Sequence, residues 1–245
     1  MTTMQVSAAV LAGGMGTRLR GVLTRCPKVL APVNGTPFIT RVLDQLAAAG
    51  IPNVVLCAGY RADQVRAYLG SGYGGMSVLH SVEDRPLGTA GALRKALDLL
   101  TTDLVLAMNG DSFVGANLAD FIRWHLDRAL SGSLLSAWVD DCARFGTLDV
   151  DARGTVQAFR EKEGKAVPGW INAGVYLLPK CWLEELAPGE PLSLEHQVLP
   201  NWLSRGLGAY RVRAPFLDIG TPETLAQASR FFAGIDRRAP SKSAS

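Results

Sequence analysis

The chain has 245 residues, of which 48% are hydrophobic and 19% charged, and its formal net charge is +3. This composition is typical of a folded domain with a large core and excludes a disordered chain. The small charge, without a run of lysines and arginines, argues against a nucleic-acid partner. No apolar run approaches the roughly 20 residues that span a bilayer. We therefore expect a cytoplasmic protein with no membrane partner. The cysteines and histidines are scattered and lack the spacing of zinc ligands.

In the first half of the chain, apolar strand-like runs alternate with amphipathic helical patterns, which predicts a largely parallel sheet covered by helices. One helix is expected to have Thr36 as its cap and Pro37 at its first position, and to end at Ala49. The other elements expected here are strands at 6–12, 53–58, 76–81 and 103–109 and helices at 63–69 and 90–100.

The second half predicts shorter strands, and a final helix from Thr221 to about Phe232. The strands are expected at 134–139, 147–150, 156–160, 171–178 and 208–214, with a turn at 151–154. No internal repeat or linker separates the two halves. We therefore predict a single-domain, Rossmann-like three-layer α/β sandwich with a mostly parallel mixed central sheet over 1–236, followed by a disordered tail at 237–245.

A glycine-rich loop, LAGGMGTRL from Leu11 to Leu19, directly follows the first strand. Glycines let backbone N–H groups approach phosphate oxygens closely, and Arg18 adds a planar cation suited to phosphate. The loop is no P-loop, because no Lys-Ser or Lys-Thr pair stands at the required spacing. It is a poor dinucleotide-binding loop, because Leu19 holds the third glycine position and no acidic residue ends the second strand. A purely structural turn is the alternative that the glycines alone allow.

Two aspartates stand where a metal site is expected. Asp111 follows an apolar strand and a glycine, so its carboxylate is expected to face the crevice at the carboxyl end of the sheet. Asp218 lies just before the final helix, where a simple turn or helix contact is the alternative. Two carboxylates together with nucleotide phosphates suit Mg²⁺, which prefers oxygen ligands and keeps several waters.

The glycine loop and the segment PKVLAPV from Pro27 to Val33 match, in order and spacing, the pattern of the sugar-1-phosphate nucleotidyltransferases, which the chain resembles over about 6–232. The resemblance implies a GT-A-like fold with a nucleotide half at about 1–115 and a sugar half at about 116–236. It also implies transfer of a nucleoside monophosphate from a nucleoside triphosphate to a sugar 1-phosphate with Mg²⁺ as cofactor. The residues implied for catalysis are Arg18, Lys28, Asp111 and Asp218, the last two holding the metal. Those implied for nucleotide binding are Leu11, Ala12, Gly13, Gly14, Gly16, Thr17, Arg18, Glu83, Gly88 and Thr89.

The sugar side rests on Glu161-Lys162 followed by the segment INAG from Ile171 to Gly174, a spacing that is similar to the family's. On its own, Glu161-Lys162 is more typical of a solvated charged run. The resemblance implies that the glutamate binds sugar hydroxyls and the lysine binds the sugar phosphate. The residues implied for the sugar phosphate are Gly146, Glu161, Lys162, Asn172 and Gly174.

Glu83 bears on the choice of base. Guanine presents two adjacent donors that one carboxylate can accept side by side, whereas uracil and thymine match an amide better. Glu83 therefore favours GTP, with a helix cap or a surface charge as the alternative. Further segments, among them the SLE of Ser193 to Glu195, are similar to the heptose 1-phosphate guanylyltransferases, which favours D-glycero-α-D-manno-heptose 1-phosphate as the acceptor. Mannose 1-phosphate with GTP, or a uridylyl- or thymidylyltransferase of the same fold, stays open.

The chemistry needs no protein nucleophile, because a sugar phosphate with a second pKa near 6 is mostly a dianion at pH 7 and can attack the α-phosphorus itself. Two other classes stay open: a catalytically silent subunit that binds a nucleotide-sugar, and a glycosyltransferase. The second leaves Arg18 and Lys28 beside the glycine loop unexplained. The sequence also leaves a homo-oligomer open.

Overall fold

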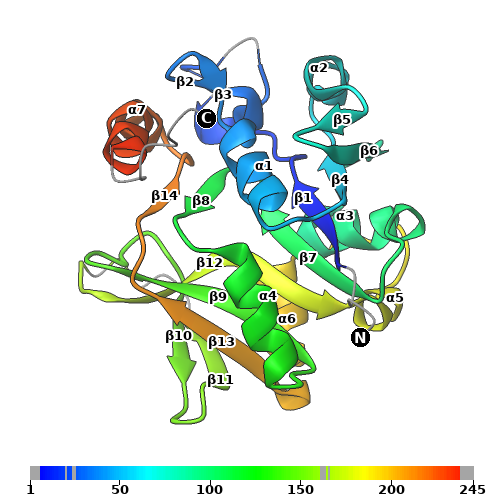
Figure 1. Ribbon diagram of the computed structural model, residues 1–245, viewed down its shortest axis with the longest axis vertical. Coiled ribbons are helices and arrows are strands. Elements are labelled where there is room, and N and C mark those ends of the chain that lie inside the picture. The colour runs from blue at the N-terminus through cyan, green and yellow to red at the C-terminus, as the bar shows by residue number, and fades with distance from the viewer. Residues whose placement is uncertain (1–5, 20, 24–25, 161–163, 165, 238–245) are drawn as a thin grey trace, which may run out of the picture.

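The computed structural model describes residues 6–19, 21–23, 26–160, 164 and 166–237. A mixed sheet runs through the molecule in the order β11-β10-β12-β7-β1-β4-β6-β5, and β9 pairs with β12 on one side and β13 on the other (Figure 1). Its core is four parallel strands, which are β1 (Val6–Leu11), β4 (Asn53–Ala58), β6 (Met76–Val82) and β7 (Leu104–Asn109). The short β5 (Gly72–Tyr73) ends one edge.

Helices cover both faces of this sheet, so each of its central strands is buried on two sides. One core cluster joins one face of the sheet to α1 (Ile39–Ala48), α2 (Ala62–Leu69), α4 (Leu118–Asp127) and α7 (Pro222–Asp236). The other joins the opposite face to α3 (Gly88–Ala96), α5 (Lys180–Glu184) and α6 (Leu199–Asn201). Burial on both faces explains the near-continuous apolar runs of the parallel strands. The predicted single-domain α/β architecture with three layers is confirmed.

The second half of the chain adds strands to the same sheet through β12 (Gly169–Pro179), which lies antiparallel to β7. The strands of this part are β9 (Gly132–Val139), β10 (Thr147–Val150), β11 (Val156–Arg160) and β13 (Leu207–Val212). β10 and β11 form the predicted hairpin, with Gly154 at φ +87° in its turn. A helix that the sequence did not predict, α4, packs in front of β9 and β13 in Figure 1.

The predicted start of the first helix is wrong. Thr36 and Pro37 form the short strand β3 (Thr36–Pro37), which pairs with β2 (Pro32–Val33), and α1 begins only at Ile39. Asn34 and Gly35 both have positive φ values, +52° and +84°, as a two-residue hairpin turn requires. The hairpin turn therefore prevails over the Thr-Pro helix-start pattern.

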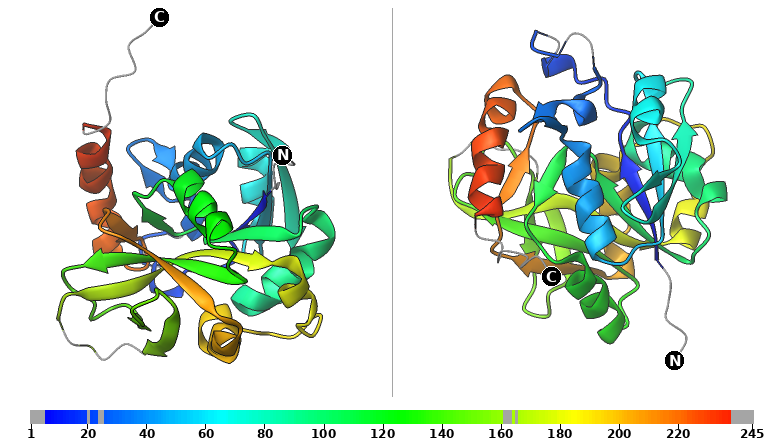
Figure 2. Two further views of the ribbon diagram at one scale, coloured as in Figure 1. Left: turned by 60° about the horizontal axis from the view of Figure 1, so that its bottom comes forward. Right: turned by 45° about the horizontal axis from the view of Figure 1, so that its top comes forward.

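A separate two-stranded ribbon of β8 (Ser112–Val114) and β14 (Phe216–Asp218) joins the middle of the chain to its last quarter. α7 follows β14 and lies beside it in both views of Figure 2. As predicted, Thr221 caps this helix, accepting a hydrogen bond from the Thr224 N–H, and Pro222 stands in its first turn. Edge-to-face contacts of Phe113 with Phe231 and Phe232 fix the helix against the ribbon.

The final helix is longer than predicted and ends at Asp236, with Arg237 as its C-terminal cap. The rest of the predicted tail, 238–245, lies outside the described residues. Within the described ranges, no helix combines the length and the apolar character that crossing a membrane requires.

Candidate active site

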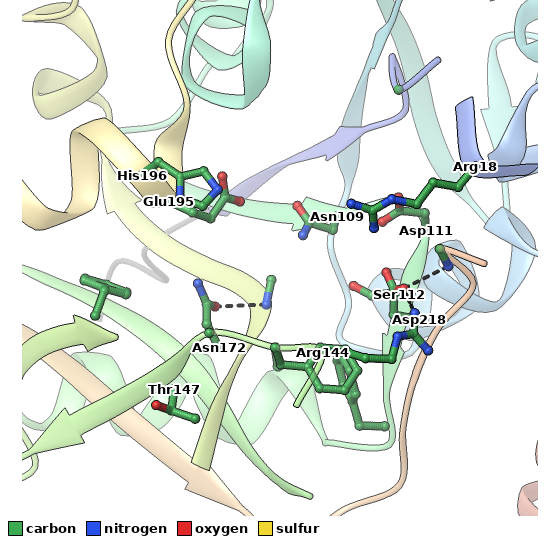
Figure 3. A pocket seen from close by; sticks show the side chains of 18 of the residues that line it. Arg18, Asn109, Asp111, Ser112, Arg144, Thr147, Asn172, Glu195, His196 and Asp218 are labelled. Atoms are coloured by element: carbon green, nitrogen blue, oxygen red, sulfur yellow. Dashed lines mark hydrogen bonds and ion pairs between the residues drawn. The ribbon is translucent and has the colours of Figure 1, made fainter. Parts of the chain in front are cut away.

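A cleft of about 820 Å³ opens at the carboxyl ends of β1 and β7 (Figure 3). Its walls come from the glycine loop, the β8–β14 ribbon, the bulged strand β12 and the segment that follows α5. Ten of the residues predicted for the site line it, which are Gly14, Gly16, Thr17, Arg18, Lys28, Asp111, Gly146, Asn172, Gly174 and Asp218. Residues from both halves of the chain therefore meet at one place.

The glycine loop leaves β1 at Leu11 and ends in a single 3-10 turn, Thr17–Leu19. Gly16 has φ +56°, a left-handed conformation that favours glycine. Leu19 is 1% exposed, so the residue that breaks the dinucleotide pattern anchors the loop in the core. Arg18 is exposed and lines the cleft. The loop thus presents backbone and a guanidinium to the cleft, while Leu19 is buried.

Lys28 opens a second 3-10 turn, Lys28–Leu30, that lies against this loop. Its Nζ donates a hydrogen bond of 2.6 Å to Oδ2 of Asp111. The two side chains are 12% and 31% exposed, so the ion pair is partly screened from water. This pair attaches the glycine-loop side of the cleft to the end of β7.

Asp111 and Asp218 lie next to each other because their strands are paired. Asp218 stands opposite Ser112 in the β8–β14 ribbon, and Ile219 N donates to the Asp111 carbonyl at 3.0 Å. Burial raises the pKa of Asp218; Lys28 lowers this pKa and the neighbouring charge of Asp111 raises it. The two carboxylates therefore repel each other, as expected of a pair that shares a divalent cation.

The donor set fits Mg²⁺ better than a fully caged metal. In the described part of the chain, no three His, Cys, Asp or Glu side chains gather to hold an ion. Two carboxylates with substrate oxygens and waters as further ligands are the usual protein share of a magnesium site at phosphates.

The wall of the cleft that Asn172 and Gly174 line is a bulge in β12 between Asn172 and Tyr176. Gly174 has φ +73°, and a side chain there would clash with Asn109 at the end of β7. The Asn172 side chain accepts from Gly174 N at 3.0 Å and donates to the Tyr176 hydroxyl at 2.9 Å. The backbone and side chains of this wall therefore hold each other in place.

Glu195 lines the cleft from a single-turn π-helix, Leu194–Val198, which Ser193 caps by accepting from His196 N. Its carboxylate accepts hydrogen bonds from the Tyr176 hydroxyl at 3.2 Å and from Thr89 at 2.8 Å. The SLE segment is thus both a helix start and part of the cleft.

Gly88 and Thr89, predicted to bind the nucleotide, do not line the cleft. The Thr89 hydroxyl also accepts from Leu194 N at 2.7 Å, and a side chain at Gly88 would clash with the Leu192 carbonyl. In this structure both residues join the start of α3 to the segment before the π-helix.

Glu83 lies over the ends of β1 and β4, outside the cleft lining. A Cβ at Gly13 would stand 2.8 Å from its Oε1, while its Oε2 accepts from Leu87 N at 3.1 Å. Burial raises its pKa, and the Leu87 hydrogen bond lowers it. Gly13 is therefore adjacent to Glu83, and neither Gly13 nor the predicted residues Leu11 and Ala12 are part of the cleft lining.

Glu161 and Lys162 lie outside the described residues, so their predicted roles stay predictions. Several lining residues were missed. Arg144 and Phe145 directly precede Gly146, which was predicted, but they stand in an irregular loop without a period to reveal them. The other lining residues that the sequence did not single out are Asn109, Ser112, Thr147, Phe159, Arg160, Ala173, His196, Pro200, Phe216 and Gly220.

Comparison with known proteins identifies a family whose members this chain resembles in sequence and in structure. The model of the nucleotidyl transferase family matches residues 7–234. A mannose-1-phosphate guanylyltransferase of Mycobacterium tuberculosis is 34% identical, over 94% of this chain and 65% of its own length. A D-glycero-alpha-D-manno-heptose 1-phosphate guanylyltransferase of Aneurinibacillus thermoaerophilus is 33% identical, over 92% of this chain and 97% of its own length. The crystal structure of HddC from Yersinia pseudotuberculosis complexed with GMP-PN superposes with a TM-score of 0.82 at 31% identity, covering 92% and 99% of the two chains.

Proposed function

The chain belongs to the nucleotidyl transferase family, and we propose that it transfers GMP from GTP to a sugar 1-phosphate, releasing pyrophosphate. The observation that carries this proposal is the single cleft in which the glycine loop, Arg18 and Lys28 face Asp111 and Asp218. The bulge of β12 completes the cleft on the sugar side. The relatives named above as guanylyltransferases support the choice of nucleotide.

In the proposed reaction, a phosphate oxygen of the sugar 1-phosphate forms a bond to the α-phosphorus of GTP. The bond from that phosphorus to the bridging oxygen breaks, and pyrophosphate leaves with the electron pair. Backbone N–H groups of the glycine loop and the guanidinium of Arg18 bind the triphosphate. Lys28 neutralises charge where the two phosphates meet, so the protein contributes in-line positioning and cations instead of a nucleophile.

Asp111 and Asp218 are the residues that would hold Mg²⁺, because they are the adjacent carboxylates at the cleft. The ion would supply neutralisation of the phosphate charge that develops during transfer.

Glu83 supports guanine as the base. Its Oε2 is engaged by Leu87 N, and Oε1 faces Gly13 at the end of β1, where a base edge could donate to it. Glu83→Gln tests this role: an amide suits uracil and thymine better than guanine. We expect kcat/KM for GTP to fall roughly tenfold or more while that for UTP or dTTP rises, since a hydrogen bond to a charged group contributes about 1.5–3 kcal/mol. An unchanged ratio of GTP to UTP turnover would remove Glu83 from base reading.

D-glycero-α-D-manno-heptose 1-phosphate is the favoured acceptor. The relative named for this heptose is 33% identical over 92% of this chain. Mannose 1-phosphate is the second candidate, because the Mycobacterium tuberculosis relative named for it is equally similar at 34%. The two sugars differ by one hydroxymethyl group, so discrimination between them depends on the part of the cleft that surrounds this end of the sugar.

The experiment that tests the proposal is pyrophosphate release by the purified protein with Mg²⁺. It crosses GTP, UTP, dTTP, CTP and ATP with the heptose phosphate, mannose 1-phosphate and glucose 1-phosphate. Release with GTP and the heptose phosphate above all other pairs is the expected result. Release with a different pair would keep the reaction and change the substrate. If the folded protein binds GTP but releases no pyrophosphate with any of the three sugar phosphates, it would instead be a catalytically silent nucleotide-sugar-binding subunit.

A further inference from the structure

Arg144 lies at the boundary between the nucleotide side and the sugar side of the cleft. Its Nη2 is 3.6 Å from Oδ1 of Asp218, on the metal side. Two residues later, the Gly146 carbonyl accepts from Asn172 N, on the sugar side. Figure 3 shows the Arg144 side chain pointing toward Asp218. The phosphate of the acceptor has to lie at this boundary, because it joins the sugar to the α-phosphorus.

The loop that carries Arg144 is held in place before any substrate binds. Asp141 accepts from Ala143 N at 2.8 Å, and Phe145 N donates to the Cys142 carbonyl at 2.9 Å. Cys142 is buried, and the Phe145 ring packs edge-to-face on Phe216 with centroids 5.3 Å apart. The exposed guanidinium therefore projects from a fixed turn, so little ordering is needed to form a new hydrogen bond.

The contact of Arg144 with Asp218 is weak, so its guanidinium can bind a ligand that attracts it more strongly. Its distance to Asp218 exceeds hydrogen-bond length, and Asp218 Oδ1 already accepts from Gly220 N at 2.8 Å. By contrast, Arg160, another cation of the cleft wall, forms two hydrogen bonds with Asp149. A guanidinium fork matches two phosphate oxygens, and a dianionic phosphate attracts it more strongly than a carboxylate that is held elsewhere.

We infer that Arg144 binds the phosphate of the sugar 1-phosphate and holds it against the Asp111–Asp218 end of the cleft. The inference rests on the proposed function and adds a residue to it. It gives the acceptor phosphate a cation within the described chain, in addition to the one that the sequence predicts at Lys162. The alternative is that Arg144 only orients Asp218, in which case its loss would alter metal and nucleotide use instead.

The test compares Arg144→Ala and Arg144→Lys with the wild type, using the acceptor that the wild type turns over. Arg123→Ala is the matched control, because Arg123 is 68% exposed on α4 and, within the described chain, its ion pair is with Asp120. The measured quantities are KM for the sugar 1-phosphate, KM for GTP and the Mg²⁺ concentration for half-maximal rate. In the reverse direction, they are KM for the nucleotide-sugar and for pyrophosphate. Circular dichroism and the thermal midpoint check the fold of each variant.

In Arg144→Ala we expect KM for the sugar 1-phosphate to rise roughly 10-fold to 100-fold, as for the loss of a charged hydrogen bond. KM for GTP and the Mg²⁺ requirement should stay within about twofold, in keeping with ordinary context-dependent variation. Arg144→Lys should recover part of the loss, because it restores the charge without the fork. In reverse, KM for the nucleotide-sugar should rise and that for pyrophosphate should not.

If the wild type is active and Arg144→Ala leaves KM for the sugar 1-phosphate unchanged, the inference is overturned but the proposed function is not. A joint rise of the GTP and Mg²⁺ requirements would also overturn the inference, because Arg144 would then act through Asp218. A wild type that turns over no sugar 1-phosphate would overturn the proposed function and this inference with it.

Discussion

The ammonium group of Lys28 lies 2.6 Å from Oδ2 of Asp111, although 83 positions separate the two residues in the chain. Lys28 comes from the turn beside the glycine loop, and Asp111 from the end of a central strand. The contact keeps a cation at the carboxylates before substrate arrives, so the positive charge does not have to be recruited during the reaction.

Replacing Lys28 by methionine should lower kcat on the order of 10²-fold, the size of effect found when one stabilising donor is removed from a reacting centre. The fold should persist, because the lost group is a partly exposed side chain at a cleft. Steady-state pyrophosphate release measures the rate, with Lys95→Met as control for the loss of a lysine. Lys95 is paired with the exposed Asp84 outside the cleft lining. Equal rates in both variants would contradict a catalytic role for Lys28.

Removal of divalent metal should abolish turnover. Excess EDTA is expected to stop pyrophosphate release, and added Mg²⁺ to restore it, because the carboxylates at the cleft are suited to this ion. Asp218→Asn should keep the hydrogen bond from Gly220 N and yet lose most of the rate. Asp120→Asn, on the exposed face of α4, serves as the control. Full activity of the wild type in EDTA would argue against the metal.

Gly174→Ala should cost more stability than its backbone conformation alone explains. Gly174 and Gly189 have nearly equal φ values, +73° and +75°, but only at Gly174 does an added Cβ meet another side chain, that of Asn109. We expect Gly189→Ala to lower the free energy of unfolding by about 1 kcal/mol and Gly174→Ala by about 1–3 kcal/mol more. Urea unfolding measures both. Equal losses would show that the contact with Asn109 relaxes freely.

Glu83 should make stability depend on pH. Burial raises its pKa in the folded state above the ordinary value of 4.5, so the ionised carboxylate destabilises the fold. The penalty is absent below the unfolded pKa and grows as pH rises through the folded pKa. Glu83→Gln, which carries no charge, should therefore have a higher thermal midpoint than wild type at pH 7, with the difference shrinking as pH falls through the folded pKa toward 4.5 and absent below it. A difference that grows on acidification would contradict this sign.

The parallel strands could be predicted from the sequence because strands buried on both faces are continuous apolar runs, as in Val6–Leu11 and Leu104–Asn109. The β8–β14 ribbon could not, because three residues on each side are too short for a period and the two strands are distant in the chain. At Thr36, two local signals competed, and the hairpin turn at Asn34-Gly35 prevailed.

The candidate site was predictable where motifs are dense. The glycine loop, Lys28 and the two aspartates were all predicted from sequence, and the structure brings them to one cleft. Arg144 was missed because it stands alone in a loop, and only the folded chain reveals that this loop reaches Asp218. Thr89 is the opposite case, because it was predicted to bind the nucleotide but does not line the cleft. Its hydroxyl instead donates a hydrogen bond to Glu195.

The β8–β14 ribbon also has a consequence for biosynthesis. The glycine loop and Lys28 leave the ribosome early, Asp111 near the middle, and Asp218 only in the last strand to be added. A nascent chain that has not yet reached Phe216 contains all four parallel strands but lacks the second carboxylate of the cleft. Translation products that stop before this strand should therefore be inert toward the cellular GTP pool, however well their first half has folded.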